Sequence, residues 1–455
     1  MSKFYHASAS LPDAIAPQHR PASIVDQCSA TARRGHLATI GIEACSLAAG
    51  QASRHNRHRM PSLSLHVTDT LASVHPSSWD ALVGDRPLLS HAFLHALHET
   101  GCASPQTGWS PRYLLLRRGD ALAGAMPLYL KAHSYGEYVF DWSWADAYRR
   151  HGRRYYPKLL AAIPFTPATG PRLLAATGEA RRRLLDGALA MLAEDRVSSL
   201  HVLFPEADDA AECKAAGMMM RASLQFHWRN PGYRDFTDFL STLNHAKRKK
   251  IRQERRKLVD AGISFRRLTA AELTSASWAF FFRCYADTYR AHGSRPYLTL
   301  PFFERIGATM PGNVVLVVGT QHGTPVCAAL DVFNRDTLWG RYWGATAYVP
   351  GLHFEACYYQ AIEFCIERGI GLFEGGAQGV HKLARGFLPV TTRSAHAIAD
   401  SDFARAIEAF VARERADVAQ TVDELERASP FRRQDPADPD AAPDDAPREA
   451  GARKA

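Results

Sequence analysis

The chain of 455 residues lacks several features that would assign it quickly to a class of protein. No run of about 18 or more apolar residues occurs, so no segment is expected to span a membrane. No P-loop, Ser-His-Asp order or metal-ligand spacing is present, which leaves a P-loop nucleotidase, a serine-hydrolase triad and a metal centre without support. The eight cysteines form no CxxC pair. We therefore expect buried free thiols and a cytoplasmic location, where thiols stay reduced.

Positive charge is the main compositional feature that the chain does have. Its formal net charge is +9 and its pI is near 9.2, which favours anionic partners such as phosphates, nucleic acid or a membrane surface. Residues 1–61 are rich in Arg and His and show little periodicity. We expect a disordered extension or an upstream false start there, rather than a targeting segment, because no apolar h-region follows. Residues 428–455 form a Pro/Asp/Ala tail that buries too little apolar surface to fold.

Between these ends, the order of expected elements occurs twice. We predict an α/β protein with α+β mixed sheets, built as two tandem domains, 62–225 and 226–427, that face a shared cleft. The first has strands at 63–67, 199–204 and 224–228, a hairpin of 113–117 with 121–130, and helices at 78–83, 90–99, 179–194 and 208–216. The second has helices at 238–260 and 276–292 and a hairpin of 314–318 with 325–334.

Residues 337–389 place a strand, a loop, a helix and a second strand in immediate succession. The strand Leu338 to Trp343 leads through a Pro-Gly turn into a helix from Leu352 to Arg368, and a short strand then ends at Glu374. The first turn of a helix has unpaired backbone N–H groups, which suit an anion. A phosphorylated donor such as coenzyme A would fit at this turn, against Tyr348, Gly351, Leu352 and His353.

Seven motifs between about Ser62 and Glu426 resemble one known family. They are GEYVFDWSWADAY (136–148), YYPKLLAAIPFTPATGPRLL (155–174), HWRN (227–230), KRKKIRQERRK (247–257), GRYWG (340–344), LHFEACYYQ (352–360) and FEGGAQGVHKLARGF (373–387). Together they resemble the bacterial predicted N-acyltransferases labelled as peptidoglycan-biosynthesis proteins, a Fem-like group of the GNAT superfamily. Where that family has a glutamate after GAQG, this chain has Val380, so a carboxylate role cannot be carried over to that position.

The resemblance implies a reaction class and its substrates. An acyl or aminoacyl group would move from acyl-CoA or aminoacyl-tRNA to an amine, with a peptidoglycan precursor as one candidate acceptor and no metal. The first half would form the acceptor side and the second half the donor side. Two alternatives stay open: a CoA-dependent acetyltransferase that acts on a small amine unrelated to the cell wall, and a catalytically silent protein that binds anionic lipid or RNA.

Candidate catalytic residues follow the last strand of this unit. Glu374 precedes two glycines, so its carboxylate could act as a general base at the edge of the cleft. His381 and Lys382 follow the glycine-rich turn, and the lysine-phenylalanine feature of Fem-type enzymes implies a site role for Lys382. His353 and Glu355 are alternative bases. A structural role for Glu374, paired with an arginine, is the competing interpretation.

Candidate substrate-binding residues come from both halves. Residues 136–172 crowd aromatic and charged groups into a segment rich in Pro and Gly, which favours a shaped loop, although core aromatics with satisfied polar tips are an equal alternative for each residue. The candidates in this segment are Asp141, Trp144, Tyr156, Lys158 and Arg172. The second half adds Arg385 and Arg341; Arg341 alternates with Tyr342 on a strand, so only one of that pair should face the cleft.

The basic run at 247–257 is the strongest charge signal, on a helix expected from 238 to 260. It could contact tRNA or an anionic lipid, or it could be a solvated helix face. Aromatic residues are not interleaved with the basic ones, so no sequence-specific DNA binding is expected.

Overall fold

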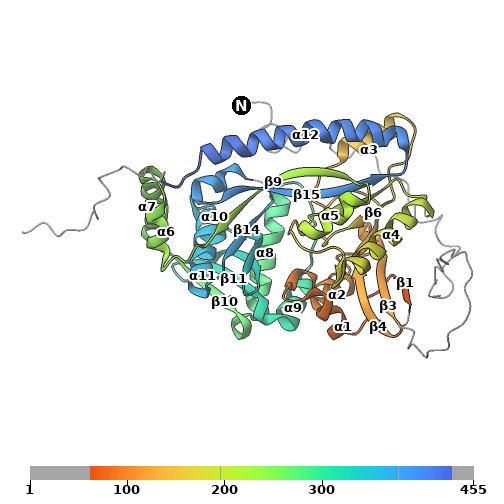
Figure 1. The fold of residues 1–455 in the computed structure, drawn as a ribbon. Coiled ribbons are helices and arrows are strands. Elements are labelled where there is room, and N and C mark those ends of the chain that lie inside the picture. Colours follow the sequence, from red (N-terminus) through yellow and green to blue (C-terminus); the bar gives the residue numbers. More distant parts are fainter. Residues whose placement is uncertain (1–61, 195, 378, 433–455) are drawn as a thin grey trace, which may run out of the picture.

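The computed structural model describes residues 62–194, 196–377 and 379–432 (Figure 1). The expectations for residues 1–61 and 433–455 lie outside these ranges. In the described part, β-strands form one mixed and one antiparallel sheet that carry helices, so the α/β fold class predicted from the sequence is confirmed. No helix in the described part is long and apolar enough to cross a membrane.

The first half alternates between runs of one to four strands and runs of one or two helices. Its strands are β1 (Leu63–Thr68), β2 (Trp109–Pro111), β3 (Tyr113–Arg118), β4 (Ala121–Met126), β5 (Leu128–Lys131), β6 (Lys158–Ala161), β7 (Leu174–Ala175), β8 (Ser199–Leu203) and β9 (Met219–Arg229). Its helices are α1 (Pro76–Val83), α2 (His91–Glu99), α3 (Trp142–Arg150), α4 (Gly178–Glu194) and α5 (Ala207–Ala215).

The second half repeats this alternation and ends in a long helix. Its strands are β10 (Ile263–Thr269), β11 (Val314–Gln321), β12 (Thr324–Phe333), β13 (Thr337–Ala345), β14 (Leu372–Ala377) and β15 (Leu388–Ile398). Its helices are α6 (Phe236–Thr242), α7 (His245–Asp260), α8 (Ser275–Ala291), α9 (Leu300–Thr309), α10 (Leu352–Phe354), α11 (Gln360–Arg368) and α12 (Ser401–Arg427). A π-helical segment, Glu355–Tyr359, joins α10 to α11. Gly369 ends α11 in the left-handed conformation (φ 67°), as its place after the apolar pattern predicts.

The larger sheet has a symmetric plan. Its eleven strands have the order β10-β11-β12-β13-β14-β9-β15-β8-β6-β5-β2, and the smaller sheet has the order β1-β3-β4-β7. In the larger sheet, β13 with β14 and β6 with β8 are parallel pairs, and the other neighbours are antiparallel. The sequence of parallel and antiparallel pairings is therefore the same going outward from β9 on one side and from β15 on the other. This symmetry is the duplicated plan that the sequence predicted.

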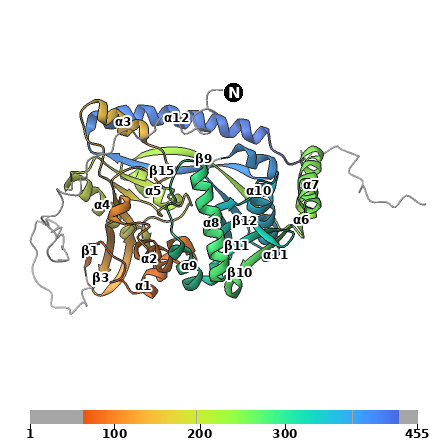
Figure 2. The same cartoon turned by 180° about the vertical axis from the view of Figure 1, so that it is seen from behind.

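Each half contributes its last strand to the other half. β9 follows β8 in the chain but pairs with β14, whereas β15 follows β14 but pairs with β8. The boundary proposed at 225/226 lies inside β9, so the division into 62–225 and 226–427 stays a prediction. α12 packs across β9 and β15 and so spans both halves (Figure 1 and Figure 2). Edge-to-face packing of Phe93 against Phe302, with ring centroids 5.6 Å apart, joins the halves elsewhere.

Three local expectations are wrong. The helix expected at 238–260 is two helices, because Leu243 is extended and the side chain of Asn244 caps α7 by accepting from Lys247 N at 3.1 Å. The tail does not begin at 428: Phe431 bridges Leu243, and Pro430 O accepts from Asn244 N at 2.9 Å. The segment 136–172 is not all loop, since it contains α3 and β6.

Candidate active site

β13 and β14 part after a short parallel contact. They pair only from Thr337 with Leu372 to Trp339 with Glu374. Beyond that point, β13 carries a β-bulge against β12, and β14 turns at Gly376, whose φ is 76°. A non-glycine residue is strained at such a φ, so the glycine permits the turn. The two strands therefore form a fork whose inner edges have no strand partner in the described part of the chain.

A cavity of about 620 Å³ lies at this fork, and we call it the fork cavity. Its walls come from β12, β13, the helix after Gly351 and the turn after Gly375, and the first half adds two residues. It is lined by Tyr138, Pro167, Ala329, Asp331, Gly340, Arg341, Tyr342, Trp343, His353, Cys357, Tyr358, Phe373, Gly375, Gly376, Gly379, Val380, His381 and Lys382. The cavity is therefore shared between the halves, as the sequence predicted for a cleft.

Four predicted site residues meet in the fork cavity: Arg341, His353, His381 and Lys382. The Tyr358 hydroxyl is 3.1 Å from His381 Nε2, and Lys382 Nζ donates to Gly376 O at 3.0 Å. Burial lowers the pKa of Lys382 to about 8. Burial and the nearby charges of His381, Lys382 and Arg385 lower the pKa of His353 to about 4. Near neutral pH, His353 is thus uncharged and Lys382 can exchange a proton.

Arg341 and Tyr342 both reach the fork cavity, which corrects the expectation that only one of them could. The β-bulge at this point of β13 breaks the alternation of side chains between the two faces. Arg341 Nη2 donates to the Phe165 carbonyl and, at 3.2 Å, to Thr166 Oγ1. The Tyr342 hydroxyl donates to the same carbonyl at 3.0 Å. These bonds fix the first half against the rim of the cavity.

Glu374 lies on the opposite face of the sheet, in a separate cavity of about 400 Å³ that also contains Thr169 and Trp339. Its Oε2 accepts from Thr169 N at 3.4 Å, and burial raises the pKa of its carboxyl to about 7. The strand runs on to Ala377, so alternation gives Gly375 to the fork cavity and Glu374 to the other face. This corrects the expectation that Glu374, His381 and Lys382 act in one cavity.

Other residues of the second half also lie outside the fork cavity. Tyr348 is 93% exposed, Leu352 is buried in a core cluster, and Gly351 (φ 89°) only begins the helix. Arg385 donates to Glu254 at 3.2 Å and to His381 O at 3.0 Å. Among the proposed cofactor-binding residues, His353 alone lines the cavity.

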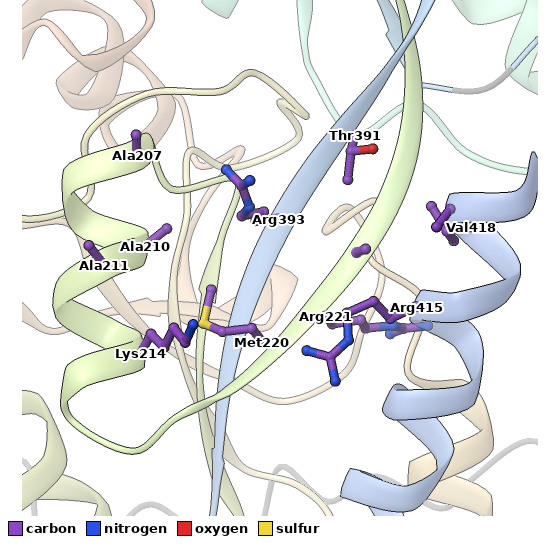
Figure 3. Close-up of a pocket in the computed structure, with 12 residues that line it drawn as sticks. Ala207, Ala210, Ala211, Lys214, Met220, Arg221, Thr391, Arg393, Arg415 and Val418 are labelled. Atoms are coloured by element: carbon purple, nitrogen blue, oxygen red, sulfur yellow. The ribbon is translucent and has the colours of Figure 1, made fainter. Parts of the chain in front are cut away.

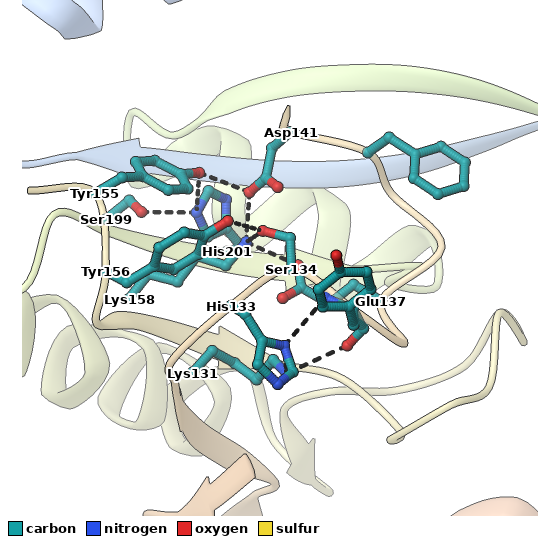
Figure 4. Close-up of polar contacts among 12 residues, drawn as sticks. Lys131, His133, Ser134, Glu137, Asp141, Tyr155, Tyr156, Lys158, Ser199 and His201 are labelled. Atoms are coloured by element: carbon teal, nitrogen blue, oxygen red, sulfur yellow. Dashed lines mark hydrogen bonds and ion pairs between the residues drawn. The ribbon is translucent and has the colours of Figure 1, made fainter. Parts of the chain in front are cut away.

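The candidates of the first half form buried structural contacts (Figure 4). Lys158 is fully buried between Asp141 and Glu137, and it donates to Glu137 at 2.8 Å. Burial opposes ionisation of Asp141, but Lys158 lowers the pKa of that carboxyl to about 2. The Tyr156 hydroxyl is 2.8 Å from Ser134 Oγ in the same network. The network holds the 134–158 segment together.

Trp144 and Arg172 also make buried contacts. The Trp144 ring packs edge-to-face against His396, with ring centroids 5.0 Å apart, and the Arg221 guanidinium lies 5.2 Å from its centroid. Arg172 is fully buried and donates to Ala168 O at 2.7 Å, which shapes the loop before β7. Neither residue lines the fork cavity, so their roles in substrate binding stay predictions without support from this geometry.

The basic helix α7 divides into an inner and an outer face. On the inner face, Arg255 pairs with Glu355 at 2.9 Å and Glu363 at 2.7 Å, while Glu254 accepts from Tyr359 at 2.7 Å. The outer face is exposed and carries Lys249, Lys250, Arg252, Arg256 and Lys257. The inner contacts attach α7 to the helix and turn that wall the fork cavity.

A further groove of about 510 Å³ lies between α5 and α12 (Figure 3). Alanines, Met220 and Val418 form much of its surface, with Lys214, Arg393 and Arg415 among them. It shares no lining residue with the fork cavity. Among the described residues, no group of three or more His, Cys, Asp or Glu side chains could hold a metal ion.

Asp331 is the site residue that sequence reasoning missed. It lies in the apolar strand β12 and lines the fork cavity. The available signal was a lone acid within the run Val326-Cys-Ala-Ala-Leu-Asp-Val-Phe, because an acid in a buried strand needs a reason to be there.

Comparison with known proteins assigns the chain to a family. The profile of the FemAB-like family, described as peptidoglycan biosynthesis/recognition, matches residues 70–433, and the chain belongs to that family. No curated protein matches the chain.

Several solved structures are similar to it. The crystal structure of FemX is 13% identical, covers 74% of this chain and 98% of its own, and has a TM-score of 0.47. L-PGS from Bacillus licheniformis is 10% identical (75% and 97% covered, TM-score 0.46). A tandem GNAT protein from the clavulanic acid biosynthesis pathway is 12% identical (74% and 99% covered, TM-score 0.40).

Proposed function

We propose that the chain is an N-acyltransferase that moves an acyl or aminoacyl group from acyl-CoA or aminoacyl-tRNA to an amine. The observation that carries the proposal is the fork itself. Parallel strands that part over glycines leave two inner edges without a strand partner in the described part of the chain. An extended donor can pair with such edges as a strand would, with its carbonyl at the cavity below.

The side chains of the fork cavity suit acyl transfer. The attack of an amine on an ester or thioester builds negative charge on the carbonyl oxygen, and a positioned cation or N–H group stabilises that charge. Lys382, Arg341 and the N–H groups beside Gly376 are the available donors. The reaction needs no metal or covalent intermediate.

The choice of donor depends on the outer face of α7. A tRNA could lie on the exposed lysines and arginines with its acyl end in the fork cavity, because the inner face of α7 contacts the cavity walls. With acyl-CoA as the donor, the outer face of α7 would bind no tRNA. The enzyme would then be the acetyltransferase that acts on a small amine. The family description supports a peptidoglycan precursor as acceptor.

Native mass spectrometry of freshly purified protein tests the proposal. The sample is sprayed as purified, then after incubation with acetyl-CoA or with aminoacyl-tRNA, each with and without a peptidoglycan-precursor amine. We expect one of the two donors to bind and an amide product to form. A protein that binds tRNA or lipid but forms no amide with either donor would be a silent binding protein, and the proposal would fail.

A further inference from the structure

Asp331 lies at the floor of the fork cavity, where three irregular features meet. The β-bulge between β12 and β13 begins at this residue. The residue opposite is Gly340, and a side chain there would come within 3.6 Å of Asp331 Oδ1. The π-helical segment Glu355–Tyr359 passes over the same site and contributes Cys357 to the cavity. Bulges and π-helical turns are both frequent at functional sites.

The carboxylate of Asp331 is buried and incompletely bonded. The residue is 2% exposed, and its Oδ2 has no hydrogen-bond partner among the described residues. A buried acid without partners costs free energy, so a purely structural role gives no reason to keep it. Burial raises the pKa of Asp331 well above its ordinary value, and the charge of Arg341 only partly opposes this.

Asp331 is also the one Asp or Glu among the described residues that line this cavity. Among the described residues that line it, the other titratable groups are Tyr138, Arg341, Tyr342, His353, Cys357, Tyr358, His381 and Lys382. The basic groups among them suit a donor's phosphates or carbonyl oxygen. Asp331 is therefore the lining residue that complements a cation.

We propose that Asp331 binds the ammonium group of the acceptor, a primary amine, and accepts its proton. This inference rests on the proposed function for the transfer step, but the binding of an amine stands by itself. Gly340, the strand partner of Asp331, has no side chain to crowd the carboxylate, since a Cβ there would lie 3.6 Å from Oδ1. An aliphatic amine fits because Ala329, Cys357 and Phe373 make the surrounding surface apolar.

The transfer step balances with this assignment. The ammonium gives one proton to the Asp331 carboxylate, and the free amine attacks the carbonyl carbon of the donor. The new C–N bond forms as the C–S bond of a thioester, or the C–O bond of an ester, breaks. The leaving thiolate or alkoxide takes a second proton from the amine nitrogen, and Asp331 later releases its proton to water.

Isothermal titration calorimetry with n-hexylamine tests the binding directly, with 1-hexanol as the uncharged control. Titrations at pH 7 in buffers of different ionisation enthalpy count the protons released. Burial raises the pKa of Asp331 and an ammonium partner would lower it again, so an ion pair between the two should release up to one proton per amine bound. We expect the amine to bind about tenfold or more tighter than the alcohol.

Asp331→Asn should remove both the preference and the proton release. Asp209→Asn is the matched control, since Asp209 is another buried carboxyl, outside this cavity, and an amide oxygen can still accept its bonds from Arg172 N and Leu173 N. If Asp331→Asn bound hexylamine with the same affinity and proton release as the wild type, the protons would come from Lys382 or a histidine and the inference would be overturned. Equal binding of amine and alcohol by the wild type would also overturn it.

The same titrations separate this inference from the proposed function. Amine binding that depends on Asp331, with no amide formed from either donor, would keep the amine site and reject the acyltransferase. Amide formation at an unchanged rate in Asp331→Asn would do the opposite.

Discussion

At the scale of single residues, the roles of the acids near the site depend on where each side chain is buried, and the sequence does not show this. Glu374 and Asp331 are both buried acids with a raised pKa, yet they lie on opposite faces of the sheet. The sequence pointed to Glu374 because two glycines follow it. The side chain of Glu374 would face the fork cavity only if the strand ended at this residue. The strand continues to Ala377, because pairing with neighbouring strands, not the local sequence pattern, sets where it ends. Likewise, the two carboxylate partners of Lys158, Asp141 and Glu137, are 17 and 21 residues away, beyond the reach of local spacing.

Glu374→Gln should make the stability less dependent on pH. Burial raises the pKa of Glu374 from 4.5 to about 7, so the folded protein keeps a proton that the unfolded chain has lost in this interval. Stability therefore falls as the pH rises from 4.5 to 7, by on the order of 3 kcal/mol, and is level above that. Urea unfolding of both proteins at pH 5 and pH 8 measures this. An unchanged pH dependence in the variant would show that this carboxyl does not titrate abnormally.

Asp331→Asn should slow transfer and leave the fold intact. Loss of a general base reduces turnover by roughly 10²- to 10⁴-fold. The amide is isosteric with the protonated acid and cannot ionise, so the melting temperature at pH 8 should be equal to or above that of the wild type. Single-turnover rates and melting curves from one preparation measure both effects. A destabilised variant with a normal rate would assign Asp331 to structure alone.

At the scale of elements, individual helices and strands could be predicted from the sequence, but the pairing of distant strands could not. The strand, helix and strand after Thr337 and the helix at 276–292 follow from periodicity and turn residues. The break before α7 was also readable, since Asn244 is a capping residue that was passed over. The pairings of β9 with β14 and of β15 with β8 join distant segments, and no local signal encodes them.

The outer face of α7 should hold a polyanionic partner. Replacing Lys249, Lys250, Arg252 and Arg256 with Gln should weaken tRNA binding and reduce the slope of log affinity against log salt by about 3 to 4, since each lost phosphate contact removes nearly one released counterion. Filter binding over a range of salt concentrations measures it. The same slope in the variant would assign the face to solubility.

Arg255→Gln is the matched control on the inner face. It removes the partner of buried Glu355, so it should lower the stability by about 2 kcal/mol, with little change in the salt slope. Denaturant unfolding measures the loss. A stable variant with a reduced slope would place Arg255 at the partner surface.

At the scale of the whole molecule, the exchange of strands makes each half dependent on the other. β9 and β15 are central strands whose neighbours come from both halves. Hydrogen bonds of Arg341 and Tyr342 to Phe165 and the packing across α2 and α9 add to this dependence. The duplicated plan was predictable from element order, but the exchange of strands was not.

The two halves should unfold together. In calorimetry we expect one transition whose calorimetric and van't Hoff enthalpies agree, because neither half retains a complete sheet without the other. Two separate transitions would mean that each half is stable alone and that the exchanged strands contribute little.

The fork cavity as the place of acyl transfer is tested most directly by filling it. Val380→Trp places a bulky side chain in the fork cavity, and Ala419→Trp does the same in the groove between α5 and α12. Donor binding is measured by native mass spectrometry with added acetyl-CoA and aminoacyl-tRNA, after melting curves confirm that both variants are folded. The account predicts that the donor bound by the wild type is retained by Ala419→Trp and lost by Val380→Trp. Retention by Val380→Trp, or loss only in Ala419→Trp, would contradict it.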